Sequence, residues 1–529
     1  MAIVKILDCT LRDGGYVNNF NFGEEVITSI ISKLADSNVE MIECGFLSDI
    51  ETYNANKTFF PTLETVKKLI GKKNPNILYV GMIALGEKEI SGDKIPVYDG
   101  SSIDAIRITF HKNEIDRGID LCTNLMTKGY KVFMQPIGTM SYSDEELLNL
   151  IKKINEINPY AFAIVDTLGT MYQNDLMRLF YLFDHNLNDN IIIGFHSHNN
   201  LQLSFTNAQA LLQLQTKREI VIDTSVFGMG RGAGNLCTEL LTQYINDNIE
   251  YRYDVIPLLE IVDEHLSLIH AKFPWGYSVP YYLSATHDCH PNYASHLLNK
   301  QTVSVKVIDC LLKQIPLSER IVYNKNLIEN IYIAYQNREV DDKLTLQQLS
   351  AKFNNRAILV MAPGKSIEEE SVIREFLNAE NPIVISVNFN NSSIMPDYVF
   401  MSNAKRYDSL RNDGDSIMNF IFTSNIKIDN LKNNFFIVNY SSLLNDNPSI
   451  SDNAGMMLLT LLKHLDVQKI FLAGFDGFTT NKIDNYYKEN MVNNVEGEEL
   501  TAKNDSIKKI IDELKQELNI KFLTKSIYE

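Results

Sequence analysis

Two histidines separated by one residue are the clearest chemical feature of the sequence. His196 and His198 stand in the run IIIGFHSH, whose apolar, β-branched residues are typical of a strand. Side chains alternate between the two faces of a strand, so both imidazoles point to one side and Ser197 to the other. Paired imidazoles at this spacing can bind one metal ion, but they also occur in purely structural hydrogen bonds. The spacing alone leaves both interpretations open.

A carboxylate that can complete a metal site follows the first apolar run, IVKILD. Asp8 ends that run and Asp13 follows in CTLRDGG; we favour Asp13 as the ligand and expect Asp8 to be structural. Two imidazoles and a carboxylate, with the amide oxygen of Asn235 as a further ligand, make a mixed nitrogen and oxygen site. Such a site suits Mn²⁺ or Mg²⁺, with Co²⁺ or Fe²⁺ as alternatives, better than structural zinc.

Eight short β-rich runs alternate with amphipathic stretches in the first part of the chain. They are IVKILD, EMIECGF, ILYVGMI, DAIRITF, KVFMQP, AFAIVD, IIIGFHS and EIVIDTSV. The alternation predicts parallel strands joined by helices, and eight such units predict a (β/α)₈ TIM barrel over residues 1–250. An open doubly wound sheet is the alternative. In a closed barrel strands seven, eight and one are neighbours, which would bring the two histidines to Asp13.

Other polar residues stand on or just after the predicted strands, at the end of a barrel where catalytic groups gather. They are Arg12, Glu43, Arg107, Gln135, Asp166 and Thr170, with Asn235 in the glycine-rich segment GMGRGAGN. Taken singly, Glu43, Asp166 and Arg107 are explained equally well as structural ion pairs. Their concentration favours an active site.

The β pattern stops near residue 250, and helical periods predict a helical extension over residues 251–345. Over residues 350–529, strand and helix patterns return and predict a separate Rossmann-like α/β domain. Its segment APGKS lacks the first glycine of a P-loop, but a strand, a glycine turn and a helix can still bind phosphate. A nucleotide-sugar or phosphate site there would involve Gly364, Ser366, Asn388 and Asp476. The alternative is that Asn388 and Asp476 only cap turns.

Composition limits the class of protein. The chain has 529 residues, 45% of them hydrophobic and 22% charged, with a formal net charge of -17. These values predict a folded multidomain protein and argue against binding to the phosphate backbone of nucleic acid. The six cysteines are scattered, which favours a reducing cytoplasm. We find no export signal, and no apolar run of about 18 residues predicts a membrane span.

Three segments, LDCTLRDGG, GFHSHNN and DTSVFGMGRGAGN, in this order resemble the metal-dependent aldolase and lyase family. That family includes 4-hydroxy-2-oxovalerate aldolase, hydroxymethylglutaryl-CoA lyase and isopropylmalate synthase. The resemblance implies a divalent ion held by Asp13, His196 and His198, with Arg12 neutralising the enolate oxygen of a bound 2-oxo acid such as pyruvate. It also implies an aldehyde as second substrate and a homodimer. The segment WGYSVPYYLSATHDCHPNYASHL more loosely resembles the helical tail of the hydroxyoxovalerate aldolases.

One position departs from the aldolase pattern. The fourth residue after the arginine is a histidine that acts as the general base in the hydroxyoxovalerate aldolases, and here it is Tyr16. Tyr16 is therefore our candidate base, and an imidazole would suit the task better. The alternatives are His111, Tyr282, His287 and His290.

The expected function is that of a metal-dependent carbon–carbon lyase acting through a 2-oxo acid enolate. SVNF, PDYVFMSN and LAGFDGF weakly resemble sialyltransferase-like Rossmann domains, which suggests a role in surface-glycan biosynthesis. Two alternatives stay open: a Claisen-type acyl-CoA condensing enzyme or lyase on the same barrel, and a metal-binding scaffold without turnover.

Overall fold

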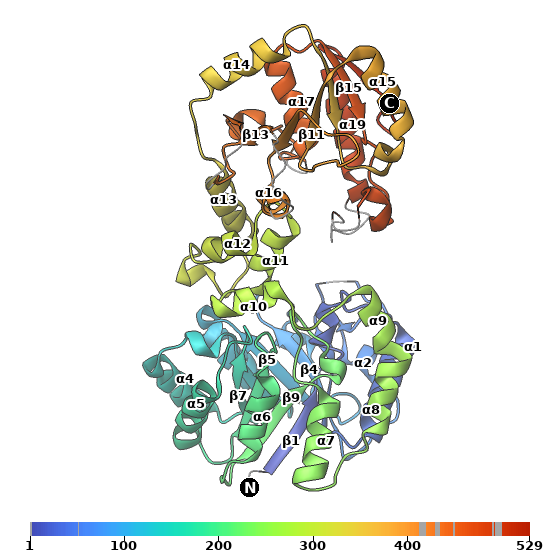
Figure 1. Ribbon diagram of the computed structural model, residues 1–529. Helices are drawn as coiled ribbons and strands as arrows, with labels where there is room; N and C mark the ends of the chain where they lie inside the picture. The colour runs from blue at the N-terminus through green and yellow to red at the C-terminus, as the bar shows by residue number, and fades with distance from the viewer. Residues whose placement is uncertain are drawn as a thin grey trace. The chain divides into compact units, whose positions relative to one another are not determined.

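The computed structural model describes residues 3–50, 52–411, 419–428, 434–447, 450–488, 491 and 500–529. The chain divides into two compact units. The first consists of Met1–Pro291 with Arg320–Val322, and the second of Asn292–Glu319 with Tyr323–Glu529. Each unit is built around its own parallel sheet (Figure 1).

Eight parallel strands form the core of the first unit. They are β1 (Ile3–Asp8), β2 (Met41–Leu47), β4 (Leu78–Ala84), β5 (Ala105–Phe110), β6 (Lys131–Pro136), β7 (Ala161–Asp166), β8 (Ile192–Ser197) and β9 (Glu219–Thr224). Strand β1 pairs with both β9 and β2, and this closes the sheet. The predicted TIM barrel is confirmed. A two-residue strand, β3 (Phe59–Phe60), extends the sheet beside β2.

Helices surround the barrel strands (Figure 1). They are α1 (Glu24–Asp36), α2 (Leu63–Ile70), α3 (Ile115–Thr127), α4 (Asp144–Ile157), α5 (Gln173–Asn186), α6 (Ser204–Leu212) and α7 (Thr238–Asn248). Helix α4 shows why these sequences form helices here. Ser143 caps it by accepting from the backbone N–H of Glu146, and Leu147, Leu150, Ile151 and Ile154 form its buried stripe.

The predicted helical region follows the barrel and is confirmed. It contains α8 (Ile256–Ile261), α9 (Ser267–Lys272), α10 (Val279–Thr286), α11 (Pro291–Asn299), α12 (Val305–Leu312) and α13 (Lys325–Gln336). Helix α8 packs on α1, where Lys33 lies 2.6 Å from Glu260. None of the helices in the described residues is long and apolar enough to cross a membrane.

A seven-stranded parallel sheet forms the core of the second unit, in the order β14, β13, β12, β11, β10, β15, β16. The strands are β10 (Ala357–Met361), β11 (Ile383–Val387), β12 (Tyr398–Met401), β13 (Asn419–Thr423), β14 (Phe435–Val438), β15 (Lys469–Ala473) and β16 (Asn519–Phe522). Its helices are α14 (Lys343–Phe353), α15 (Glu370–Glu380), α16 (Ala404–Arg411), α17 (Ala454–His464) and α19 (Lys503–Leu514). This confirms a separate C-terminal parallel sheet domain. The strand order reverses between β10 and β15, which makes this point a topological switch.

Candidate metal centre

The barrel brings Asp13, His196 and His198 together at the carboxyl ends of its strands. One ligand atom from each lies within 4.8 Å of the others, and all three residues are buried. The histidines come from β8 and the turn after it, and Asp13 comes from the turn after β1. The strand neighbours β8, β9 and β1 account for this meeting, because their carboxyl ends lie side by side.

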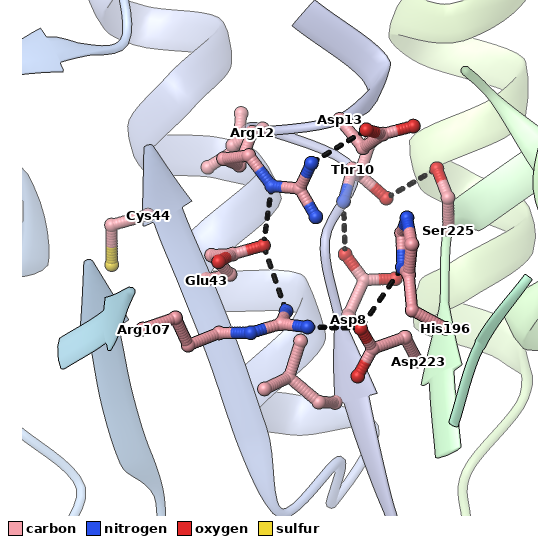
Figure 2. Close-up of polar contacts among 12 residues, drawn as sticks. Asp8, Thr10, Arg12, Asp13, Glu43, Cys44, Arg107, His196, Asp223 and Ser225 are labelled. Atoms are coloured by element: carbon pink, nitrogen blue, oxygen red, sulfur yellow. Dashed lines mark hydrogen bonds and ion pairs between the residues drawn. The ribbon is translucent and has the colours of Figure 1, made fainter. Parts of the chain in front are cut away.

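Asp223, at the end of β9, orients one of the ligands. Its Oδ2 lies 2.9 Å from His196 Nδ1, so the imidazole donates there and leaves Nε2 for a metal ion (Figure 2). We did not single out Asp223 from the sequence. Its position in the sequence could have indicated this role, because Asp223 lies near the carboxyl end of the strand between β8 and β1.

Unpaired polar atoms surround the cluster. His198 Nδ1 lies 3.9 Å from Asp13 Oδ2, and it is buried without a hydrogen-bond partner among the described residues. Burial lowers the pKa of His198 to about 3, so the imidazole is uncharged at neutral pH. Asn235 Nδ2 donates to Asp13 Oδ2 at 2.8 Å, while Asn235 Oδ1 is buried and also lacks a described partner. These donor atoms fit a divalent ion, which would satisfy them.

A row of alternating charges lies beside the cluster (Figure 2). Arg12 donates to Asp13 at 2.5 Å and to Glu43 at 2.8 Å, and Arg107 donates to Glu43 at 3.0 Å and to Asp223. Burial alone would raise the pKa of Asp13, but the neighbouring Arg12 guanidinium holds it well below its usual value. Arg12 keeps a buried Nη2 without a described partner. That nitrogen is a free donor on the residue next to the ligand Asp13.

Three further predicted residues lie around the barrel interior. Both oxygens of Asp166 accept backbone N–H groups, from Thr170 at 2.9 Å and from Met171 at 3.1 Å. Asp166 therefore shapes the turn after β7 and places Thr170, which is buried. Gln135 is also buried, and its side chain makes no hydrogen bond to another described residue.

Tyr16 lies between two cations. Lys88 Nζ donates to Tyr16 Oη at 3.3 Å, and the guanidinium carbon of Arg231 lies 4.4 Å from the centroid of the Tyr16 ring. Among the alternative bases, His111 Nε2 lies 3.6 Å from Glu87 Oε1. Burial lowers the pKa of His290 to about 4, with the charge of Arg231 acting in the same direction.

The barrel sequence matches known proteins of one family. Residues 3–261 match the HMGL-like family model, and this part of the chain belongs to that family. A 4-hydroxy-2-oxovalerate aldolase of Geobacillus genomosp. 3 is 25% identical over 49% of this chain and 76% of its own length. An oxaloacetate decarboxylase of Mycobacterium tuberculosis is 24% identical over 45% of this chain and 68% of its own length.

A solved structure also resembles the barrel. It is the N-terminal domain of a provisionally assigned aldolase from Bacteroides vulgatus, with 26% identity and a TM-score of 0.49. The alignment covers 57% of this chain and 98% of the solved one. The family match and the buried cluster identify the barrel of this chain as a metal-dependent carbon–carbon lyase or aldolase.

A cavity of about 240 Å³ lies in the second unit. Part of its lining comes from the loops after β10, β11 and β15, including Gly364, Asn388 and Asp476, and Arg406 on α16 also lines it. Ser366 does not line the cavity; it holds Asp476, whose Oδ2 accepts the Ser366 backbone N–H at 2.8 Å. Asn388 Oδ1 accepts the backbone N–H of Ser402 at 2.9 Å.

Proposed function

We propose that the barrel is a metal-dependent aldolase that makes or breaks a carbon–carbon bond at the carbon atom next to the keto group of a 2-oxo acid, with pyruvate as the common product or substrate. The observation that carries this proposal is the buried cluster of Asp13, His196 and His198 beside a guanidinium with a free donor. A cluster that only stabilised the fold would be expected to pair its buried polar atoms.

Each residue of the cluster has a proposed role. Asp13, His196 and His198, with Asn235 Oδ1 as a fourth ligand, would hold Mn²⁺ or Mg²⁺, which polarises the oxygens of the 2-oxo acid when bound. Arg12 is proposed to donate through Nη2 to the oxygen on which negative charge develops. Glu43 fixes Arg12 through the 2.8 Å ion pair. Arg107 in turn pairs with Glu43, so we expect Arg107 to support the site by holding Glu43 in position.

The base that moves the proton is proposed to be Tyr16. Its hydroxyl accepts from Lys88 Nζ at 3.3 Å, and the guanidinium of Arg231 packs on its ring. His290 and His111 are the alternatives. Gln135 and Thr170 are proposed to orient the substrate, with Asp166 holding the loop that carries Thr170.

The test is hydrogen exchange at the methyl group of pyruvate. Metal-free protein with pyruvate in D₂O should show no loss of the methyl proton signal, and added Mn²⁺ should start it. His196→Ala should abolish the exchange, whereas His185→Ala, on helix α5, should leave it intact. No exchange with Mn²⁺ or Mg²⁺ would overturn the aldolase proposal. A Claisen-type acyl-CoA enzyme, or a scaffold without turnover, would then take its place.

We propose a second function for the C-terminal domain, namely binding of a nucleotide-sugar or phosphate compound. The supporting observation is that its cavity lies at the carboxyl ends of β10 and β15, on either side of the switch point. Parallel α/β sheets bind ligands at this position. Glycine, amide and aromatic groups line the cavity together with Arg406. A role in surface-glycan synthesis would follow.

Calorimetry with the full chain tests the second function. Cytidine and uridine nucleotides are titrated first, and inorganic phosphate separately. Arg406→Gln should weaken nucleotide binding at least tenfold. Arg374→Gln, in an exposed pair with Glu370 on α15, should not. If neither the nucleotides nor phosphate binds, the proposal fails.

Two further proposals come from the sequence. We propose that the protein works in the cytoplasm, which accords with its six free thiols. We also propose that it is a homodimer, as the family resemblance implies.

A further inference from the structure

One half-buried cation beside the metal cluster has no hydrogen-bond or ion-pair partner among the described residues. Arg231 lies in the loop that follows β9. Its guanidinium packs on the Tyr16 ring, and it makes no ion pair or hydrogen bond with any residue that the structure describes. An anion near a partly buried guanidinium is favourable, because removing water from the charge alone is costly.

The loop holds Arg231 next to the cluster. A Cβ atom on Gly230 would lie 2.3 Å from Asn235 Nδ2 and 3.1 Å from Asp13 Oδ2, so the backbone beside Arg231 touches the metal ligands. On the other side, Gly232 has a φ of +65° and Ala233 donates its backbone N–H to Asn200 Oδ1 at 2.9 Å. Arg231 is therefore anchored on both sides.

A second cation shares the Tyr16 ring. Lys88 Nζ lies 4.7 Å from the ring centroid, and it comes from the segment just after β4. Its nearest carboxylate is Glu87 at 3.8 Å, which also faces His111 at 3.6 Å. His111 lowers the pKa of Glu87 most, and the charges of Lys88 and Arg231 lower it further, so this one carboxylate faces both cations and can balance only one of them.

The charge of the cluster shows that a simple 2-oxo acid does not balance Arg231. Three carboxylates (Asp13, Glu43 and Asp223) face two guanidiniums (Arg12 and Arg107), so the cluster carries one net negative charge when its imidazoles are neutral. A divalent ion reverses this to one positive charge, which the single carboxylate of pyruvate cancels. Arg231 then remains as an extra positive charge beside Lys88. This arrangement costs electrostatic energy unless a second anion is present.

We infer that Arg231 and Lys88 bind a second anionic group of the substrate, remote from the 2-oxo acid carboxylate. The inference rests on the proposed aldolase function and narrows its substrate class. The aldehyde partner carries a carboxylate or a phosphate, and the adduct is an acidic 4-hydroxy-2-oxo acid. In the addition, the methyl carbon of pyruvate loses one proton and bonds to the aldehyde carbon, whose oxygen gains one proton. No oxidant or reductant is required.

Binding of two matched acids tests the inference without turnover. 2-Oxovalerate and 2-oxoglutarate each have five carbons and differ only in ending in a methyl or a carboxylate. Calorimetry with the Mn²⁺-loaded full chain should show at least tenfold tighter binding of 2-oxoglutarate. Arg231→Met should reduce this ratio to about threefold or less, and Arg231→Lys should restore most of it. Arg178→Met, in an exposed pair with Asp144, is the matched control.

The outcomes separate the inference from the proposed function. Equal binding of the two acids, or a ratio that Arg231→Met leaves unchanged, overturns the inference even if the pyruvate methyl exchange succeeds. Failure of the exchange, with the ratio intact, overturns only the aldolase reaction. Aldol assays with acetaldehyde, glyoxylate and glycolaldehyde phosphate then identify the source of the anion. A preference for glyoxylate indicates a carboxylate, one for glycolaldehyde phosphate indicates a phosphate, and a preference for acetaldehyde contradicts the inference.

Discussion

Asp223 connects the metal ligands to the charged residues beside them. It accepts from His196 Nδ1 and also pairs with Arg107, and burial leaves it little contact with water. Burial alone would raise the pKa of Asp223, but the charge of Arg107 and the hydrogen bond from His196 lower it. The carboxylate thus stays charged and keeps His196 in the orientation that metal binding requires.

We expect Asp223→Asn to weaken Mn²⁺ binding by about 10- to 100-fold, because an amide cannot fix the imidazole as a carboxylate does. The affinity is measured from free Mn²⁺ by electron paramagnetic resonance. Asp175→Asn, at a carboxylate that accepts the backbone N–H of Tyr172 at the start of α5, serves as the control. An affinity within twofold of the wild type would show that Asp223 does not support the site.

The burial of Asp8 should make the free energy of unfolding depend on pH. Burial raises its pKa to about 6, although Thr238 and the backbone of Thr10 donate to it. In the unfolded chain the same carboxyl releases its proton near pH 4. The stabilisation of the fold by protonated Asp8 is therefore fully present below about pH 4 and is lost as the pH rises through about 6.

Asp8→Asn should remove that dependence. From pH 4 to 7, the free energy of unfolding of the metal-free wild type should fall relative to the variant by up to about 3 kcal/mol. Urea unfolding at both pH values measures the difference. A constant difference would mean that Asp8 is ionised in the fold throughout this range.

The metal ligands were predictable from the sequence because alternation on a strand and barrel closure are general rules. His196, His198 and Asp13 followed from them, and the structure brings the three together. The roles of Lys88 and Arg231 were not predictable, because their common contact with Tyr16 depends on how separate loops pack.

At the scale of elements, the loop after β9 sets the geometry of the site. Gly230 allows Asn235 to reach Asp13, and Asn199 and Asn200 tie the loop to the turn after β8. A backbone loop held from both neighbouring strands keeps its polar groups in place before any ligand binds.

Gly230→Ala should disrupt the loop, because the added methyl group would lie 2.3 Å from Asn235 Nδ2. We expect Mn²⁺ affinity to fall at least tenfold while the barrel stays folded by circular dichroism. Gly118→Ala, in helix α3 with ordinary contacts of 3.4 Å or more, is the matched control. Unchanged affinity in Gly230→Ala would contradict the role of this loop.

The elements with strong hydrophobic patterns were predictable, and the short ones were not. All eight barrel strands match predicted apolar runs, since strands buried on both faces are apolar throughout. We missed β3, with two residues, and β16, whose sequence NIKF has only two apolar residues. We also missed β13 (NFIFT) and β14 (FFIV).

At the scale of the whole molecule, the chain joins two α/β units with different sheets. The family match covers residues 3–261 and therefore concerns the barrel alone. The proposed function of the C-terminal domain rests on its cavity. The fold class was predictable because the hydrophobic pattern changes along the chain from alternating strands and helices to helices alone and back again. The switch point between β10 and β15 was not, because strand order is not contained in a local pattern.

The most direct test of the account is the number of Mn²⁺ ions that the full chain binds. We predict one tight site per chain by electron paramagnetic resonance, lost in Asp13→Asn and in His198→Ala and retained in His185→Ala. Absence of a stoichiometric site in the wild type, or an equal site in the two ligand variants, would contradict the assignment of Asp13, His196 and His198 as a metal centre.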